Sequence, residues 1–169
     1  MYKLGYTFDL GPATVPVDLS GGATTGKRVN LRNAQNLNIV LFKGAEAGTD
    51  DPVLTLNQWQ ASSGGSASAL AVDHIWVKSA TTLAGTEQWV NVANGTAGVG
   101  SRTVTLTGLA GKQAIVLIEI NTKDLAEGFD YVSVDTLDAG ATAQLGGIFY
   151  VLADLVTRRS PANMPATLF

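Results

Sequence analysis

The sequence predicts an all-β protein: a single-domain β-sandwich, jelly-roll-like, with about nine or ten short strands. Three observations carry this prediction. Short apolar runs rich in β-branched residues recur along the 169-residue chain. Clusters of Gly, Pro, Asn and Asp separate these runs at intervals of about 10–20 residues. No apolar pattern of helical period is long enough for an α-helix, so we expect only one short helical turn, near residues 121–128.

The firmest strand predictions lie on either side of that helical turn. Ala114–Ile120 is apolar at all positions but one, which is typical of a strand covered on both faces. Tyr131–Thr136 alternates two valines with more polar residues, which is typical of a strand covered on one face. Between them, Asn121 is placed to cap the turn, and Asp124 occupies the capping-box position. We therefore expect a buried central strand, a capped connection and a half-exposed partner strand.

The N-terminal segment is predicted to form a strand and an arm. Five apolar residues alternate with other residues across Tyr2–Leu10, which indicates a strand. Gly11 and Pro12 are expected to end it. An extended path resumes afterwards, but Pro12 and Pro16 exclude it from the centre of a sheet, because proline lacks a backbone N–H. Residues 1–19 are assigned to this strand and arm.

The remaining strands are predicted from alternation and from β-branched and aromatic content. They are Lys27–Leu31, Leu37–Lys43, Val53–Gln60, Leu70–Ser79, Gln88–Val92, Arg102–Thr107 and, within Gln144–Leu155, a strand around Ile148–Leu152. Val53–Gln60 follows an Asp-Asp-Pro sequence that also suits a helix start. Its short length and its Leu-Thr-Leu alternation favour a strand that ends near Trp59. Asn33–Asn36 is predicted to be a turn and Ala61–Ala69 a surface loop.

The composition excludes several kinds of site and partner. The chain has no cysteine, which excludes disulfides, thiolate nucleophiles and cysteine-ligated metals. Its 11 basic residues are scattered and its net charge is −3, so no nucleic-acid partner is expected. No apolar run approaches the ~20 residues that span a bilayer, so no membrane partner is expected either. The N-terminal residues lack the apolar core of a secretory signal.

The surface is expected to carry little charge. Charged residues make up 15% of the chain, against about 25% in a typical domain. Glycine is frequent, with 19 residues. This composition suits a protein that is packed against neighbours, and it suits a monomeric β-sandwich with many turns equally well.

Residues able to support catalysis or metal binding are sparse. His74 is the only histidine and no GxSxG motif occurs, so a Ser-His-Asp site is not expected. A single histidine also excludes histidine-rich metal sites. Asp50 and Asp51 either bind a hard cation together with loop carbonyls or cap the segment that follows. The chain is predicted to be a non-enzyme without a cofactor or an assigned metal site, and the question of a cation at Asp50 and Asp51 is left open.

The tryptophans and the chain ends are the other candidates for function. Trp59, Trp76 and Trp89 either form a platform for sugars or anchor the core or an interface. Residues 158–169 contain two prolines and no period, so they are predicted to be an extended tail beyond a β-sandwich domain of residues 1–157. Aromatic or apolar residues near both ends and two arginines are candidate assembly contacts. These are Tyr2, Tyr6, Arg158, Arg159, Leu168 and Phe169.

Three segments carry a family resemblance: Leu37–Gln58, Ile118–Thr136 and Gln144–Pro165. Together they resemble small virion structural proteins of tailed bacteriophages, of the head decoration (cement) type. The resemblance implies a protein that binds the outer surface of the major capsid lattice and stabilises the head. It implies the major capsid protein and further copies of the chain, commonly as a trimer, as partners. It also implies a place on the capsid surface of the virion after synthesis in the host cytoplasm. The matching segments are strand-and-turn patterns, so no individual functional residue is assigned from them.

Two other functions are retained as alternatives. The first is a phage tail or head–tail connector subunit, although a tail-tube ring needs a continuous sheet and the predicted strands are short and interrupted. The second is a carbohydrate-binding β-sandwich module that uses the tryptophans.

Overall fold

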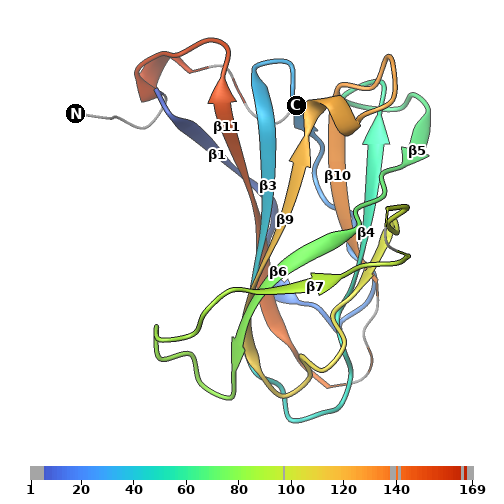
Figure 1. Cartoon of the computed structure of the whole chain (residues 1–169), viewed down its shortest axis with the longest axis vertical. Helices are drawn as coiled ribbons and strands as arrows, with labels where there is room; N and C mark the ends of the chain where they lie inside the picture. Colours follow the sequence, from blue (N-terminus) through green and yellow to red (C-terminus); the bar gives the residue numbers. More distant parts are fainter. Residues whose placement is uncertain (1–5, 97, 138–139, 141, 165, 167–169) are drawn as a thin grey trace.

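Two antiparallel β-sheets pack face to face in the computed structural model, which describes residues 6–96, 98–137, 140, 142–164 and 166 (Figure 1). These residues form eleven strands, two single-turn 3₁₀ helices and no α-helix. The prediction of an all-β sandwich is therefore confirmed, with slightly more strands than expected. Within the same ranges, no helix is long and apolar enough to cross a membrane.

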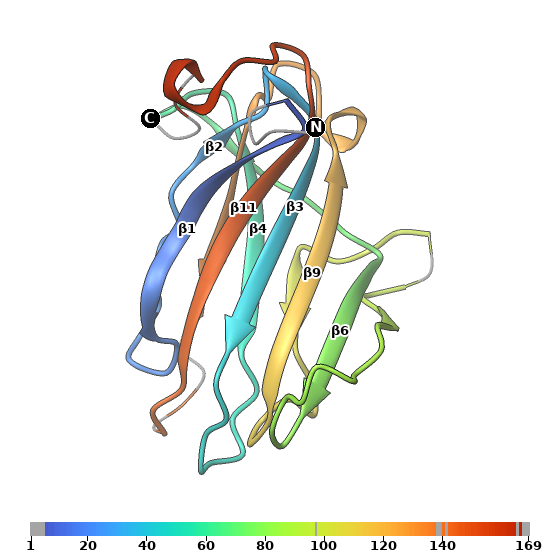
Figure 2. The same cartoon turned by 90° about the vertical axis from the view of Figure 1, so that its left-hand side faces the viewer.

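The larger sheet has six strands in the order β1-β11-β3-β9-β6-β7. Figure 2 views this sheet face on, with β1, β11, β3, β9 and β6 side by side. The strand bounds are β1 Phe8–Asp18, β11 Leu145–Leu155, β3 Ala34–Lys43, β9 Gln113–Asn121, β6 His74–Ala80 and β7 Val90–Ala93.

The smaller sheet is built around β4, Val53–Trp59, which is the strand predicted there. One edge of β4 pairs along its length with β10, and β10 pairs in turn with β2. The other edge of β4 pairs with β5 at one end and with β8 at the other. The bounds of these neighbours are β10 Tyr131–Thr136, β2 Val29–Asn30, β5 Ala67–Ala69 and β8 Thr103–Thr105.

The strand pairing is that of a jelly roll, as predicted. β1 pairs with β11, β2 with β10, β3 with β9 and β4 with β8, so the first four strands pair in reverse order with the last four. The nested pairs alternate between the two sheets, as in a long hairpin rolled into two layers. Strands β5, β6 and β7 are inserted between β4 and β8. The inserted β6 and β7 extend the larger sheet beyond the jelly roll.

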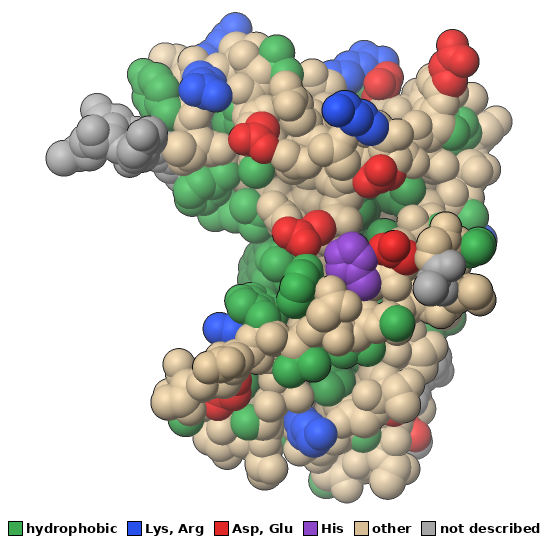
Figure 3. Space-filling model, viewed as in Figure 1, with side chains coloured by type: hydrophobic (Ala, Val, Ile, Leu, Met, Phe, Trp, Pro, Cys, Tyr) green, Lys and Arg blue, Asp and Glu red, His purple; other side chains and the backbone are tan. Residues whose placement is uncertain are grey.

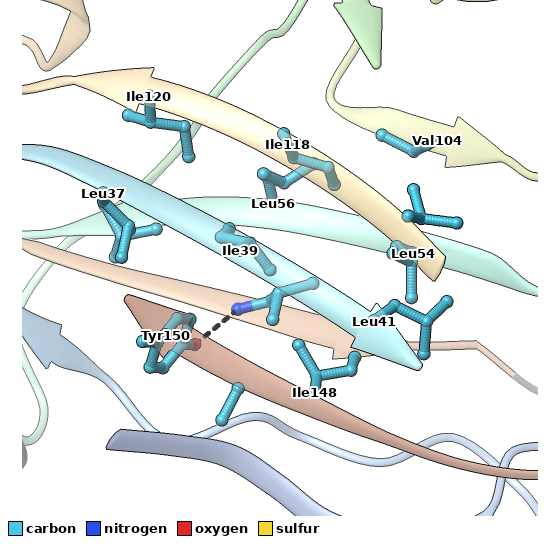
Figure 4. Packing of buried hydrophobic residues seen from close by; sticks show 14 of the residues in the cluster. Leu37, Ile39, Leu41, Leu54, Leu56, Val104, Ile118, Ile120, Ile148 and Tyr150 are labelled. Carbon is cyan, nitrogen blue, oxygen red and sulfur yellow. Dashed lines mark hydrogen bonds between the residues drawn. The ribbon is translucent and has the colours of Figure 1, made fainter. Parts of the chain in front are cut away.

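The core lies between the sheets and follows the two-residue period of the strands. Leu37, Ile39 and Leu41 of β3 point into it and are fully buried. Leu54 and Leu56 of β4 belong to the same buried cluster (Figure 4). Burial of each of these side chains stabilises the fold by about 1.5–3 kcal/mol.

The N-terminal strand differs from the prediction. β1 runs through Gly11 and Pro12 without ending there, because it is an edge strand that pairs only with β11 and an edge tolerates proline. Two register shifts, between Pro12 and Thr14 and between Thr14 and Val17, accommodate the irregular backbone. The expectation that the prolines exclude this segment from a sheet centre is confirmed. Residues 2–5 of the predicted first strand lie outside the described residues.

The burial of β9 and β10 is the reverse of the prediction. β9 is buried on one face only, because Ile115 and Leu117 point away from the smaller sheet and stay partly exposed. β10 is buried at every position except Asp135. Its outer side is covered in part by Trp59, whose Nε1 donates a hydrogen bond to Ser133 Oγ (2.9 Å). β9, which was expected to be covered on both faces, is therefore covered on one. β10, which was expected to be covered on one face, is covered on both.

The predicted helical turn is confirmed as η1, Thr122–Asp124. Asn121 Oδ1 accepts the Lys123 N–H (3.0 Å), and the Asp124 carboxylate accepts the Asn121 N–H (2.8 Å). These two bonds are the reciprocal contacts of a capping box.

Two short elements fall where none was predicted. β5 lies in the expected loop Ala61–Ala69, where the Ala-Ser-Ala sequence carries no strand signal and pairing with β4 decides the conformation. A single 3₁₀ turn, η2 (Pro161–Asn163), lies in the tail that was predicted to be extended. Proline in the first turn of a helix is favourable, because its missing N–H would have no partner there.

Tyr150 of β11 connects the two sheets across the core. Its hydroxyl donates to the Lys27 carbonyl (2.7 Å) and accepts from the Val134 N–H of β10 (3.1 Å; Figure 4). β2 pairs with β10 only at Tyr131 and Val132, so the hydroxyl satisfies a backbone N–H that lies beyond the end of β2. Burial raises the pKa of the Tyr150 phenol above its ordinary value, which keeps it neutral and able to donate.

Gly26 continues the same edge of β10. Thr24 and Thr136 exchange two backbone hydrogen bonds of 2.9 Å, and the Gly26 N–H donates to the Asp135 carboxylate (3.0 Å). A Cβ at Gly26 would lie 1.9 Å from the Val134 carbonyl oxygen. Only glycine allows the chain to run this close to β10.

We expect Tyr150→Phe to lower the free energy of unfolding by about 1–3 kcal/mol, because the Val134 N–H and the Lys27 carbonyl lose their partner inside the core. Urea unfolding followed by circular dichroism measures the change. Tyr6→Phe is the control: Tyr6 is 45% exposed, so its variant should differ from the wild type by less than about 0.5 kcal/mol. Equal losses in the two variants would contradict a structural role for the Tyr150 hydroxyl.

Candidate functional site

The outer face of the larger sheet, which is the side turned away from the smaller sheet, is open to solvent. No further layer of secondary structure in the described ranges covers it (Figure 1). In profile this side of the molecule is hollowed, with hydrophobic side chains inside the hollow and acidic side chains and the histidine near it (Figure 3). The outer face divides into an apolar sector, an aromatic sector and a polar hollow.

The apolar sector is formed by β1, β11 and β3. Leu10 lies opposite Val151, and Phe149 lies between Pro12 and Val40 in the strand register. These residues line a hollow of about 460 Å³. A second hollow of about 360 Å³ lies farther along the same strands and has the following lining residues: Pro16, Phe42, Gly44, Leu145, Gly146, Gly147 and Phe149. No side chain that lines either hollow is charged.

The apolar sector arises because β3 and β11 carry apolar residues on both faces, so that some point into the core and others point outward. In β3, Leu41 points into the core while its neighbours Val40 and Phe42 point outward. The outward side chains are large and well exposed, with 52% of Phe42 and 41% of Phe149 accessible. Contiguous exposed apolar surface of this kind marks interaction sites in soluble proteins.

The aromatic sector lies on the inserted strands and the adjacent part of β9. Trp76 and Trp89 line a hollow of about 270 Å³ together with Leu117 and Glu119. Trp76 Nε1 donates to Glu119 Oε2 (2.8 Å), which orients both side chains. Trp89 is 42% exposed, and the Lys78 ammonium lies 4.9 Å from the centroid of its ring. Two indoles therefore stand beside a carboxylate on an open surface.

The polar hollow, of about 480 Å³, adjoins the aromatic sector and shares Glu119 with it. Asn121 Nδ2 donates to Asn36 Oδ1 (2.7 Å), and Asn36 Nδ2 donates to the Asp154 carboxylate. Asp154 has a φ of 53°, the one non-glycine residue of the described chain in the left-handed region. The side-chain amide of Asn38 lines the hollow and has no partner among the described residues. The hollow thus offers both donors and acceptors.

A histidine and an aspartate lie next to each other at the hollow. His74 lines it, and its Nδ1 contacts the adjacent Asp73 carboxylate (2.5 Å). The His74 ring also meets the Trp76 ring edge to face, with centroids 6.2 Å apart. Among the described residues, no group of three or more His, Asp and Glu side chains is placed to hold a metal ion.

Asp51 has a structural role in the loop before β9. Its carboxylate accepts the N–H groups of Gly108, Leu109 and Ala110 at 2.9, 2.9 and 2.8 Å. The carboxylate therefore caps a turn, and the turn is far along the chain from Asp51 itself. Of the two alternatives for Asp51, capping is the one observed. The capped segment differs from the expectation, which was the segment directly after Asp51.

Three of the candidate assembly contacts at the chain ends lie within the described residues. Tyr6 precedes β1, and Arg158 and Arg159 follow β11; all three are exposed. Arg158 Nε donates to the Leu155 carbonyl (3.4 Å). None of the three lines a hollow of the outer face. Tyr2, Leu168 and Phe169 lie outside the described residues.

The structure separates the three tryptophans into two roles. Trp59 is covered by Arg28, whose guanidinium carbon lies 3.5 Å from the ring centroid. Trp76 and Trp89 line the same hollow, because β7 returns antiparallel beside β6. Residue type points to all three tryptophans as candidates, but nothing in the sequence points to Asn38 and Asp154, which belong to no motif. The sequence does indicate the outer face, because β3 and β9 carry apolar residues at successive positions and therefore on both faces of the sheet.

The nested pairing and the two packed layers place the chain in the class of jelly-roll β-sandwiches. No model of a known protein family matches the chain, and no curated protein is significantly similar to it. Jelly rolls serve as capsid proteins, as lectins and as enzymes, so the class does not select a function.

We expect Asp51→Ala to lower the free energy of unfolding by about 2–3 kcal/mol, because three backbone N–H groups lose a charged acceptor. Thermal and urea unfolding measure the loss, and Glu127→Ala, at an exposed position, is the matched control. The melting temperature should be the same in EDTA and in calcium, since the Asp51 carboxylate is already occupied. A calcium-dependent rise that Asp51→Ala abolishes would show a cation site there.

Proposed function

We propose that the chain is a non-enzymatic structural protein of a tailed-bacteriophage virion, namely a head decoration protein that binds the outer surface of the major capsid lattice and stabilises the head. Its partners in this proposal are the major capsid protein and further copies of the chain, associated as a trimer. It acts on the capsid surface after synthesis in the host cytoplasm. The open apolar sector of the larger sheet is the observation that carries the proposal.

The apolar sector has the character of an interface core. β9, which pairs with β3 beside this sector, has the sequence of a strand covered on both faces, yet only one of its faces is covered within the described chain. Leu10 and Phe42 each leave 52% of their surface accessible. Depletion of charge and enrichment of aromatic residues distinguish the buried centre of an interface from ordinary surface. A partner that covers this sector would bury the outward apolar residues of these strands, as a second layer does for a strand that is apolar on both faces.

The dimensions of the outer face suit a stable complex. Strands β1, β11, β3 and β9 have 9 to 11 residues each. At about 4.8 Å between strands and about 3.3 Å per residue, they present on the order of 600 Å². Each partner in a standard protein interface buries about 800 Å². The four strands therefore present most of the area that one partner buries in a standard interface.

The identity of the partner is supported by the family resemblance. Leu37–Gln58, Ile118–Thr136 and Gln144–Pro165 resemble virion structural proteins, and they contain most of β3 and β4, all of β10 and β11, and part of β9. The resemblance thus extends over both sheets, including the strands of the apolar sector. The low charged fraction of 15% agrees with a protein that is buried against neighbours.

Binding to capsids tests the proposal directly. Purified protein is mixed with mature capsids that lack it, and binding is measured by co-sedimentation. Phe149→Asp should weaken binding at least about thirtyfold, the effect of losing a hot-spot contact of about 2 kcal/mol. The change places a charge at the centre of the apolar sector without touching the core, so the circular dichroism spectrum and melting temperature should stay close to those of the wild type.

Val99→Asp is the matched control, because Val99 is a loop residue that is 73% exposed and lies outside the apolar sector. This variant should bind capsids like the wild type. Failure of the wild type to bind capsids would refute the decoration function. Capsid binding that Phe149→Asp leaves intact would place the contact on another surface.

A further inference from the structure

We propose that the aromatic sector and the polar hollow together bind a neutral oligosaccharide. The two hollows, of about 270 and 480 Å³, are joined through Glu119 into one site of the size that small-molecule ligands occupy. This site lies mainly on β9 and β6, with Trp89 just before β7 and with polar groups from the ends of β3 and β11. The inference does not rest on the proposed capsid-binding function.

The indoles provide the stacking surface that a sugar ring needs. A pyranose has a face of C–H groups and a rim of hydroxyls, so it pairs with a flat apolar ring that has polar groups at its edge. Trp89 is 42% exposed, and Trp76 is held in place by its 2.8 Å hydrogen bond to Glu119. Lys78 contacts the Trp89 ring with a flexible side chain, which a bound ring can displace.

The polar hollow provides partners for the hydroxyls. Sugar hydroxyls both donate and accept, and they are best bound by amides and carboxylates whose positions are already fixed. The Asn121–Asn36–Asp154 series of hydrogen bonds fixes three such side chains. Each carboxylate, of Asp154 and of Glu119, uses one oxygen in these contacts and has its second oxygen without a partner among the described residues. The amide of Asn38 is also without a partner, so it is available as a donor and an acceptor.

The charges around the site select a neutral ligand. Glu119, Asp124 and Asp154 line the polar hollow, and no lysine or arginine side chain lines it. An acidic sugar, a phosphate or an acidic peptide would be repelled by these three carboxylates. A metal ion is disfavoured as well, because the described residues hold no group of three or more His, Asp and Glu side chains placed for one.

The position of the site in the fold points in the same direction. The jelly roll is closed by the pairs β1–β11, β2–β10, β3–β9 and β4–β8, and none of them needs β6 or β7. The inserted segment adds Trp76 and Trp89 to the open face, together with His74. Surface segments added to a rigid scaffold are where binding residues concentrate.

A panel of neutral oligosaccharides built from glucose, galactose, mannose and N-acetylglucosamine tests the inference, first on an array and then by titration calorimetry. We expect saturable binding of at least one member. Trp89→Ala and Asn38→Ala should each weaken it about tenfold or more, a difference of one decade in the dissociation constant. Gln35→Ala, which removes an exposed amide from the same strand as Asn38, and Val99→Ala should bind like the wild type.

Several results would overturn the inference. One is the absence of binding by every member of the panel at about 10 mM, well above a weak dissociation constant of about 1 mM. Another is binding that both Trp89→Ala and Asn38→Ala leave unchanged while their circular dichroism spectra match the wild type. A third is self-association of the wild type that Trp89→Ala abolishes, without any bound glycan, since this would assign the sector to a second copy of the chain.

Loss of capsid binding in Phe149→Asp with sugar binding intact would separate this site from the apolar sector.

Discussion

The hydrogen bonds of Tyr150 across the core are the interaction on which the relative position of the two sheets depends. β2 pairs with β10 for only two residues, so the backbone of β10 beyond it needs other partners. The Tyr150 hydroxyl and the close approach of Gly26 supply them. Tyr150 points inward from β11, so its neighbours Phe149 and Val151 must point outward, because successive side chains of a strand lie on opposite faces. The arrangement that closes the core therefore also positions the apolar sector on the opposite side of the sheet.

Features that depend on local pattern are predictable from the sequence. The bounds of β10, Tyr131–Thr136, are those of the predicted strand, and Val53–Trp59 is the strand favoured over a helix. The capping box at Asn121 follows from residue type and spacing alone. These features are predictable because neighbouring residues determine them.

Features that depend on distant contacts are not predictable in the same way. The sequence of β9 places apolar residues on both faces of the strand. It does not tell whether the layer that covers the second face belongs to the same chain. Lys43 continues the inward series of β3 and is fully buried, because its ammonium donates to the Leu109 and Lys112 carbonyls at 2.6 and 2.7 Å. Burial lowers the pKa of Lys43 below its ordinary value. No local pattern indicates these hydrogen bonds of Lys43, nor the hollow that Trp76 and Trp89 line together.

The edges of the larger sheet restrict how the protein can associate. β1 forms one edge and contains Pro12 and Pro16, which lack the N–H groups that a continuing sheet would need. β7 forms the other edge and has only four residues, Val90–Ala93. A ring of subunits joined through one continuous sheet requires two long, unobstructed edges, and neither edge meets this requirement. Association through the open face is not limited in this way, because side chains and not backbone groups make the contact. This distinction favours a protein that docks flat on a surface over one that polymerises strand to strand.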